Sequence, residues 1–543
     1  MRVKLLLLAA GIILSNHVVL ERLAYYVGFS HWFPLLVFLG IWVVSLLAIG
    51  YVALTPSKGA RLFWTIWIVI STLVGESYFL IMEDRITITA LDAMWVPGLM
   101  DISVPAFYGK QIAQALLATM ILAAGLLIPP PVIRWLRYRP LTLAPILPCL
   151  MLAGLIFYVA GLKGNETKGM PSQFYNLSLF AIYLATENTS PEKADVDIPL
   201  VGRSGLQHIV LIIDESVSGD FIDLNVPRGT TPFLLSKASS IANFGLATSA
   251  SNCSNASNAI LRHGANPDTL GRKGHDMFRN PTVWKYARGA GYETNLIDLQ
   301  YDSDNMQNFL FAPELELIDH KTKSPEGTSA AFRDFTLFTQ LRDIMKRPAP
   351  QFVFVIKRGA HVPYAQNHPD DRVFFKPAME RHEAISDRTR LVNSYKNVIR
   401  WTVDSFFQEF LDQVSLANAV VIYTSDHGQN LLDDGKPVTH CRRTAQSLYE
   451  AVVPLMVFTG RADLKPSFAR SASKNYNKAS HFEIFPTLLV LFGYEADAVR
   501  TRYNQSLFED IETPLGFTSG PISGRFGRAP TWNSRAGLNV MAR

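Results

Sequence analysis

The distribution of apolar residues divides the chain into two unlike parts. Residues 1–165 are mostly apolar, whereas the remainder alternates short apolar runs with polar stretches. A helix needs about 20 predominantly apolar residues to cross a bilayer. Four segments meet this requirement, namely Trp32–Leu54, Leu62–Met82, Ile112–Pro129 and Leu143–Leu162. The pattern therefore predicts an α-helical membrane domain followed by a larger water-soluble domain.

A weaker apolar segment, Leu5–Tyr26, precedes these four and contains the polar residues Asn16 and His17. Arg2 and Lys4 lie ahead of its short apolar core, which is also the layout of a signal peptide. We favour a retained helix, because no convincing small-residue cleavage site follows and similar spans come next. The prediction is therefore five transmembrane helices within residues 1–165.

The loop charges predict which side of the membrane holds the soluble domain. With five spans, basic residues gather on one side, whereas the opposite loops carry only two and several acidic residues. The first side receives Arg2, Lys4, Lys58, Arg61, Arg134, Arg137 and Arg139, and the second receives Arg85, Lys110, Glu83, Asp84, Asp92 and Asp101. The side rich in lysine and arginine is cytoplasmic. We therefore expect a multi-pass protein of the bacterial inner membrane with its C-terminal domain in the periplasm.

One carboxylate, Glu76, falls inside a predicted span. Intramembrane carboxylates are costly and often functional. Two interpretations stay open: Glu76 serves a lipid headgroup, or it is a plain polar partner for Asn16, His17 or Arg22.

Polar, turn-like segments around residues 164–169 and 189–193 separate the two halves. Between them, Pro171–Thr186 has apolar residues at helical spacing. This indicates either an amphipathic helix along the bilayer interface or an ordinary docking helix. The expected division is a transmembrane domain at 1–165, an interfacial helix and linker at 166–204, and a catalytic domain at 205–543.

From Leu206 onward, short apolar strands alternate with helix-like stretches. The strands are expected at Gln207–Ile213, Glu293–Leu299, Gln351–Ile356, Ala419–Tyr423 and Val453–Phe458, and helices at Asp387–Val414 and His481–Phe492. Such alternation predicts an α/β domain with a mostly parallel central sheet covered by helices. The Gly/Arg/Pro-rich tail after Thr513 is expected to be loosely ordered.

Metal-ligand side chains follow three of these strands. Glu215 follows the first and His361 the third, while Asp426 and His427 follow the fourth, with His440 thirteen residues beyond His427. Ligands collect beyond the carboxyl ends of parallel strands, and carboxylate with imidazole is a usual catalytic zinc set. Each residue alone has a structural explanation, since a lone aspartate often caps a helix. Together they predict a divalent-metal site.

A small polar segment, Asn252–Asn258, opens a predicted helix and offers nucleophiles. A serine hydroxyl is a poor nucleophile unless a base or a metal activates it. The N-terminus of the helix would favour an anion there. On residue types alone Ser251, Cys253, Ser254 and Ser257 are not separated, and a plain N-cap role for Ser254 stays open.

Residues 205–510 resemble the alkaline-phosphatase/sulfatase superfamily, and the five spans narrow the resemblance to lipid-dependent phosphoethanolamine transferases. It rests on Glu215 after the first strand, Thr230-Thr231-Pro232, Ser425-Asp426-His427-Gly428, His361 in a Gly-x-His-x-Pro-Tyr context, and His440. The resemblance implies that Ser254 replaces the family's usual threonine nucleophile. It also implies that Glu215, Ser254, Asp426 and His427 hold one or two zinc ions, and that His361 and His440 lie on the substrate side.

By the same resemblance, phosphoethanolamine moves from a phospholipid, expected to be phosphatidylethanolamine, to an envelope acceptor through a covalent phosphoserine. Lipid A, the lipopolysaccharide core or a periplasmic glucan is the expected acceptor. Phosphoglycerol transfer on the same scaffold, a phosphate or sulfate ester hydrolase, and a non-catalytic envelope sensor or scaffold are the alternatives. Asp214 stands where the transferases commonly have glycine, and the Asp214-Glu215 pair is similar to the paired acids of sulfatases.

Only three cysteines occur. Cys253 adjoins the proposed nucleophile and Cys441 adjoins His440, so a disulfide in an oxidising compartment would fix both sides of the site. Two free thiols are the alternative, because the sequence does not give the Cα separation. The net charge is only +5 with scattered basic residues, which argues against a nucleic-acid partner.

Overall fold

The protein divides into two compact units. The first comprises Met1–Trp95 and Val104–Thr189, and the second comprises Val96–Ser103 and Ser190–Arg543. The computed structural model describes residues 1–88, 90–91, 103–130, 139–161, 168–185, 192–202, 205–272, 276–300, 308–381, 383, 385–443, 446–520, 522, 529–540 and 543. The predicted loop residues Asp92, Asp101, Arg134 and Arg137 and most of the two linker turns lie outside these ranges.

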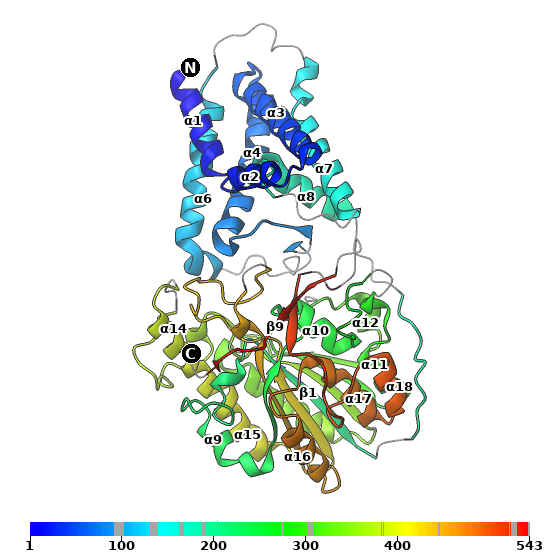
Figure 1. The fold of residues 1–543 in the computed structure, drawn as a ribbon. Coiled ribbons are helices and arrows are strands. Elements are labelled where there is room, and N and C mark those ends of the chain that lie inside the picture. The colour runs from blue at the N-terminus through cyan, green and yellow to red at the C-terminus, as the bar shows by residue number, and fades with distance from the viewer. Residues whose placement is uncertain are drawn as a thin grey trace. The chain divides into compact units, whose positions relative to one another are not determined.

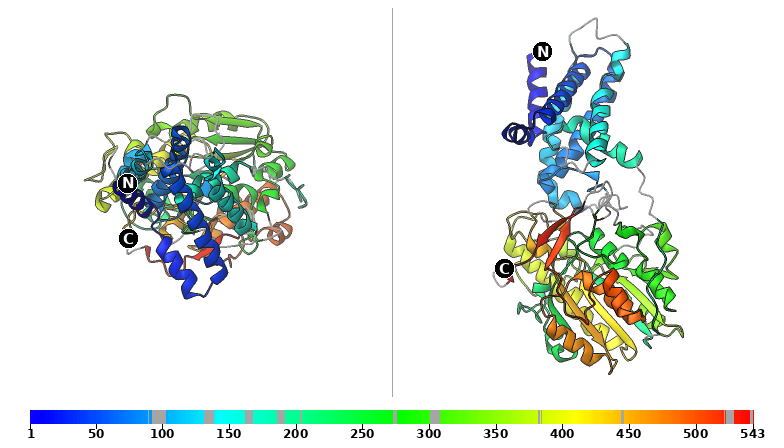
Figure 2. Two further views of the ribbon diagram at one scale, coloured as in Figure 1. Left: turned by 90° about the horizontal axis from the view of Figure 1, so that it is seen from above. Right: turned by 45° about the vertical axis from the view of Figure 1, so that its right-hand side comes forward.

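Helices make up the first unit (Figures 1 and 2). They are α1 (Arg2–Leu14), α2 (Val19–Gly28), α3 (Trp32–Leu54), α4 (Lys58–Met82), α6 (Ser103–Leu127), α7 (Ile146–Gly161) and α8 (Ser172–Ala185). Four helical spans are long and apolar enough to cross a membrane: Trp32–Leu54, Lys58–Met82, Tyr108–Leu127 and Leu141–Tyr158. The four clear predicted spans are therefore confirmed.

The predicted fifth span is not one straight helix. It is a pair, α1 and α2, bent by 65°. At the bend the Ser15 hydroxyl donates to the Gly11 carbonyl at 2.7 Å, and the Asn16 amide donates to the Ile12 carbonyl at 2.8 Å. Such bonds from short polar side chains to nearby carbonyls compete with continuation of the helix. If this bent pair is counted as one span, the described residues contain five candidate membrane spans, and otherwise four.

Two long-range contacts agree with the predicted alternation of loops. Lys4 Nζ donates to the Leu126 and Ile128 carbonyls at 3.2 and 2.6 Å, so the start of α1 lies at the end of α6. On the side predicted to face away from the cytoplasm, Arg85 Nη1, just after α4, donates to the carbonyl of Met170, just before α8, at 2.8 Å. Residues predicted to share a side of the membrane therefore lie close together.

The helix predicted at Pro171–Thr186 is α8, and it packs closely against α4 and α7. Its apolar Phe174 and Leu179 are buried. Its polar side is buried too, because Asn176 Nδ2 donates to the Ser71 carbonyl at 2.8 Å and a Cβ at Gly75 would clash with Asn176. This burial is that of a docking helix, the second of the two interpretations.

A seven-stranded sheet forms the centre of the second unit, in the order β2-β7-β6-β1-β5-β3-β4. The bounds are β1 His208–Asp214, β2 Ala242–Thr248, β3 Glu293–Asp298, β4 His320–Lys323, β5 Gln351–Ile356, β6 Ala419–Ser425 and β7 Val452–Thr459. Strands β6, β1, β5, β3 and β4 run parallel, while β7 pairs antiparallel with both β6 and β2. The mostly parallel sheet is therefore confirmed.

Helices cover both faces of this sheet (Figure 1). One face packs against α10 (Ser254–His263), α11 (Val283–Gly289) and α17 (Ile484–Phe492), with Trp284 lying 5.4 and 5.3 Å from the Phe352 and Phe354 rings. The other face meets α15 (Phe406–Gln413), where Phe407 contacts Tyr423 at 4.8 Å. The two alternating faces of the central strands β1, β5 and β6 are thus both buried, as is usual in parallel sheets.

The helical regions predicted at Asp387–Val414 and His481–Phe492 are confirmed with altered detail, and the second is a 3-10 turn at His481–Glu483 followed by α17. Asp387–Val414 comprises α14 (Arg388–Ile399), a π-helical stretch at Arg400–Ser405, and α15. The tail expected to be loosely ordered instead contains a hairpin, β8 (Gly516–Ser519) with β9 (Thr531–Ser534). Its Phe517 is fully buried and Ser251 bridges to Thr518, so this part of the tail packs next to the nucleophile segment.

Candidate active site

Strand register places the candidate ligands at one edge of the sheet. In the β1–β6 pair, Asp214 lies opposite Ser425, so Glu215 and Asp426 leave neighbouring strands at the same level. On the other side of β1, Ile213 lies opposite Ile356, the last residue of β5. Parallel strands end at the same edge, which is why residues more than 200 positions apart meet here.

Glu215 is buried and is held from two directions. Gln300 Nε2 donates to its Oε2 at 2.8 Å, and the Ser216 hydroxyl donates to its Oε1 at 2.8 Å. Burial acts to raise the pKa of Glu215, but the hydrogen bond and charge of His427 outweigh it and hold this pKa well below its ordinary value. Glu215 therefore stays ionised and offers an oriented carboxylate.

Asp426 is oriented by the backbone. Its Oδ1 accepts the N–H groups of Ser216 at 2.9 Å and His427 at 2.7 Å. Its Oδ2 is buried and has no hydrogen-bond partner among the described residues. Burial and the nearby Glu215 carboxylate raise the pKa of Asp426 well above its ordinary value. A buried carboxylate oxygen with no donor is costly unless a cation binds it.

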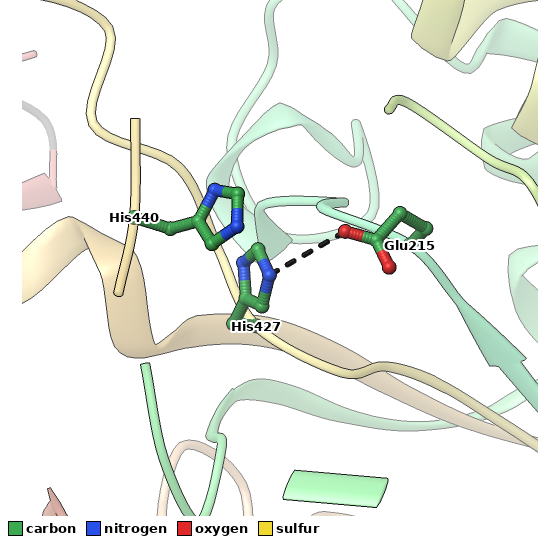
Figure 3. Close-up of side chains that lie close together, drawn as sticks. All are labelled: Glu215, His427 and His440. Carbon is green, nitrogen blue, oxygen red and sulfur yellow. Dashed lines mark ion pairs between the residues drawn. The ribbon is translucent and has the colours of Figure 1, made fainter. Parts of the chain in front are cut away.

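The two histidines complete this side of the site (Figure 3). His427 Nδ1 bonds to the Gly428 carbonyl at 2.7 Å, which leaves Nε2 for the site, 3.5 Å from Glu215 Oε1 and 3.6 Å from Asp426 Oδ2. Burial acts to lower the pKa of His427, but the charges of the Asp426 and Glu215 carboxylates outweigh this effect and raise the pKa to about 9. The His440 ring stacks on the His427 ring at 4.1 Å. Burial and His427 hold the pKa of His440 well below its ordinary value, so this ring is neutral.

Ser254 is the first residue of α10, and its hydroxyl reaches the same point. Its Oγ lies 3.0 Å from His427 Nε2 and 3.5 Å from Glu215 Oε1. Two of the other candidate nucleophiles are engaged elsewhere. The Ser257 hydroxyl donates to the Ser251 carbonyl at 2.9 Å, and Cys253 is in a disulfide. Ser254 is also not the N-cap, which is Cys253. Geometry thus singles out Ser254 within the segment.

These residues fit a bound divalent ion. Ligand atoms of Glu215, His427 and His440 all lie within 4.8 Å of one another. The unpaired Asp426 Oδ2 and the Ser254 hydroxyl lie beside the same His427 nitrogen. Carboxylate oxygen and imidazole nitrogen are the ligand types that zinc takes in catalytic sites. His440, expected only on the substrate side, lies in the ligand group itself.

His361 follows β5 and lies beside the same site. Its Nδ1 bonds to the Val362 carbonyl at 2.5 Å, which fixes the ring. Its nearby ring acts to lower the pKa of both Glu215 and His440. The Asn367 amide also donates to the His361 carbonyl, so the loop after β5 is held at both its side chain and its backbone.

Asp214, which resembles the second acid of a sulfatase, does not join this group. Its Oδ2 accepts Lys357 Nζ at 2.6 Å and the Tyr423 hydroxyl at 2.8 Å, and both charged side chains are fully buried. Burial raises the pKa of Asp214 to about 6, although Lys357 acts to lower it. Asp214 is therefore half of an internal ion pair beneath the site. The sequence analysis gave no role to Lys357 or to Gln300, the partner of Glu215.

Of the two alternatives left open for Cys253 and Cys441, the structure has the disulfide. Cys253 and Cys441 are bonded, with Cα atoms 4.5 Å apart and a sequence separation of 188. The bond joins the residue before Ser254 to the residue after His440. A backbone hydrogen bond from Cys441 N to the Asn252 carbonyl at 2.9 Å runs beside it. The nucleophile segment and the His440 loop are thus held together covalently.

Among curated proteins, the chain is similar to enzymes that are named as phosphoethanolamine or phosphatidylethanolamine transferases. The Kdo(2)-lipid A phosphoethanolamine 7''-transferase of Escherichia coli K12 is 21% identical over 300 residues, 53% of this chain and 52% of that protein. The phosphatidylethanolamine transferase Mcr-1 of E. coli is 23% identical over 349 residues, 59% of each chain. The matched part of this chain spans about half the length of these relatives.

A solved structure resembles the fold of this chain along nearly its whole length. The integral membrane protein lipooligosaccharide phosphoethanolamine transferase A of Neisseria meningitidis aligns over 94% of this chain and 97% of its own, with a TM-score of 0.60 and 17% identity. These likenesses confirm the expected resemblance and fold class. The family described as Sulfatase matches residues 207–494, more than half of the chain. The chain therefore belongs to the sulfatase family.

Proposed function

We propose that the protein is a membrane-anchored, zinc-dependent phosphoethanolamine transferase with Ser254 as its nucleophile. The donor is a phospholipid, phosphatidylethanolamine, and the acceptor is lipid A or another lipopolysaccharide or glycan component of the envelope. The observation that carries the proposal is the Ser254 hydroxyl, 3.0 Å from His427 Nε2 and 3.5 Å from Glu215 Oε1 at the edge of the sheet. The transferase names of the relatives support the headgroup.

In the first half-reaction the Ser254 oxygen attacks the phosphorus of the donor headgroup. The hydroxyl loses its proton, an O–P bond forms, and the bond from phosphorus to the diacylglycerol oxygen breaks. A zinc ion held by Glu215, Asp426, His427 and Ser254 would supply positive charge, which lowers the pKa of a hydroxyl and neutralises phosphoryl oxygens. Diacylglycerol leaves as the alcohol after it takes up a proton.

The residues around Ser254 have distinct tasks in this step. The carboxylates are held by Gln300 and by backbone N–H groups, so the site is oriented before substrate arrives. The N-terminus of α10 carries partial positive charge, which favours the phosphoryl group on its first residue. His361 would serve on the substrate side, where an imidazole can donate a hydrogen bond to a phosphoryl oxygen or a proton to the leaving oxygen. His440 lies among the possible ligand atoms and stacks on His427, so it would help to hold the ion.

In the second half-reaction a hydroxyl or phosphate oxygen of the acceptor attacks the phosphoserine. The new O–P bond forms as the bond to Ser254 breaks, and the serine oxygen recovers a proton. No water is consumed, so the headgroup is transferred without hydrolysis. A membrane unit suits this chemistry because the donor lies in the bilayer, and the loop charges predict that the catalytic unit faces the periplasm of a bacterial inner membrane.

The test is transfer by the purified full chain in vesicles that contain lipid A and a labelled phospholipid. Wild-type protein is expected to transfer the label from phosphatidylethanolamine and not from phosphatidylglycerol. Ser254→Ala should abolish transfer, whereas Ser254→Thr, which keeps a hydroxyl, should retain it. Quenched wild-type protein should show the mass of one phosphoethanolamine on the peptide that contains Ser254. Full activity of Ser254→Ala would refute the nucleophile, and label from phosphatidylglycerol alone would refute the headgroup.

A further inference from the structure

A short 3-10 turn, Leu448–Ala451, packs against the backbone that follows the candidate ligand His427. A Cβ at Gly428, the next residue, would clash with the Tyr449 carbonyl, so this close approach requires glycine. The Gly428 N–H donates to the Glu450 carbonyl at 2.8 Å. The turn therefore fixes the backbone immediately after His427.

The Glu450 side chain is fully buried and extends from this turn to two other segments. Its Oε2 accepts a hydrogen bond from the Asn252 amide at 2.7 Å. Its Oε1 accepts the Ser447 N–H at 3.0 Å, as part of a capping box, and lies 3.6 Å from Arg442 Nε. Partners on both oxygens fix the plane of the carboxylate, and such pairing offsets the cost of burying its charge.

The two segments that the Glu450 side chain reaches carry groups of the active site. Asn252 precedes Ser254 by two residues, and Arg442 follows His440 by two. The Asn252 amide also donates to the Arg442 carbonyl at 2.8 Å, so the segments meet directly beside Glu450. The nucleophile and one candidate ligand are therefore joined through a contact that this carboxylate completes.

We infer that Glu450 is a positioning residue, which sets how the Ser254 hydroxyl lies relative to the two stacked imidazoles of the site. Its side chain holds the segments of Ser254 and His440, and its carbonyl holds the backbone after His427. The disulfide joins only the first two of these segments. The expected effect on transfer rests on the proposed function, whereas the expected effect on the ligand group does not.

The chain contains a second glutamate in the same kind of setting. Glu483 is fully buried and forms a capping box with Ser480, as Glu450 does at its own turn. Its Oε1 accepts hydrogen bonds from Asn504 and Thr513, both at 2.9 Å, and neither belongs to a segment of the site. Glu483→Gln is therefore the matched control, because it removes a buried acceptor of the same kind at a turn that holds no residue of the site.

The experiment compares Glu450→Gln and Glu483→Gln with the wild type in the purified full chain. The amide group of glutamine accepts no hydrogen bond, so each variant loses a contact while the size of the side chain stays the same. Both variants should unfold at a lower urea concentration. Only Glu450→Gln should bind zinc about tenfold more weakly, in competition with a chelator, and transfer the headgroup with a kcat about 100-fold lower. The KM for either substrate should change little, because no contact to substrate is lost.

Asn252→Ala tests the same contact from the other side and leaves the carboxylate in place. Its kcat should fall by a similar factor, and the double variant with Glu450→Gln should be little worse than either, because residues in contact are not additive. Wild-type kcat and zinc affinity in Glu450→Gln, or the same losses in Glu483→Gln, would overturn the inference. Wild-type kcat in Asn252→Ala would overturn it even if Glu450→Gln does not fold. If the wild type transfers nothing, the proposed function fails, and a loss of zinc affinity confined to Glu450→Gln still supports the positioning role.

Discussion

Removal of the disulfide beside the site tests whether a covalent link sets the geometry of catalysis. The perturbation is the double variant Cys253→Ala/Cys441→Ala, which leaves no free thiol behind. The bond closes a loop of 188 residues and joins the segment of Ser254 to the loop of His440. Two effects are therefore expected together, a loss of stability and a loss of turnover.

The size of the stability loss follows from the length of the closed loop. In the chain-entropy relation the cost of closure grows with the logarithm of the loop length, and a loop of this size corresponds to about 5 kcal/mol. Domains are commonly stable by only about 5–15 kcal/mol. The variant should therefore unfold at a much lower denaturant concentration. For turnover, a shift of about 1 Å between reacting groups can cost roughly 100-fold in rate.

Urea unfolding of the full chain, followed by tryptophan fluorescence to which the buried Trp284 contributes, measures the first effect. Headgroup transfer measures the second, and we expect kcat to fall more than the KM for either substrate changes. Cys149→Ala is the control, because Cys149 is a free cysteine in α7. An unfolding midpoint and a kcat equal to those of the wild type would refute the reasoning.

Three further predictions concern the metal, the core and pH. Chelation should abolish transfer and lower the unfolding temperature, and added zinc should restore both. In Asp426→Asn, zinc should not raise the unfolding temperature. A zinc-dependent rise in unfolding temperature equal to that of the wild type would contradict the assignment of Asp426 as a ligand. Lys357→Met should cost about 3–5 kcal/mol in urea unfolding, because it leaves a buried carboxylate unpaired, whereas Lys285→Met, which breaks a more exposed pair, should leave the midpoint nearly unchanged. Burial lowers the pKa of His481 to about 3, whereas a histidine in the unfolded chain has a pKa of about 6.5. The free energy of unfolding should therefore fall by about 2 kcal/mol between pH 7 and pH 5, because the unfolded state binds a proton that the folded state does not. Urea titrations at both pH values should show a smaller loss in His481→Gln.

The sequence predicted the strands whose signal is an apolar run. It missed β4, whose residues His320–Lys323 are polar and largely exposed, because an edge strand need not be apolar. It also missed β2, where the pattern breaks at Gly245, with φ +78°, and the pairing register shifts between Asn243 and Leu246. Strand β4 forms by pairing with β3 and β2 by pairing with β7, and pairing partners are not visible in a local pattern.

The candidate site was predictable where ligands follow strands directly. Glu215, Asp426 and His427 meet because adjacent strands end at one edge. Ser254 required the tertiary structure, since its segment contains several equivalent hydroxyls and only one reaches His427. The sequence predicted His440 on the substrate side and did not reveal that its ring stacks on His427. That contact depends on the position of a loop fixed by the disulfide. Loops of this kind carry no periodic signal.

The adjacent acids Asp214 and Glu215 show how local geometry bears on the choice of reaction. Successive side chains of a strand point to opposite sides. Asp214 is the last residue of β1 and turns to Lys357 and Tyr423 in the core, so only Glu215 enters the site. A sulfatase-type pair of acids would need both carboxylates at the metal. Lys357 holds the Asp214 carboxylate away from the site. The Asp214-Glu215 pair was the sequence feature that most favoured a sulfate-ester hydrolase, and its separation leaves the transferase arrangement as the better account of this site.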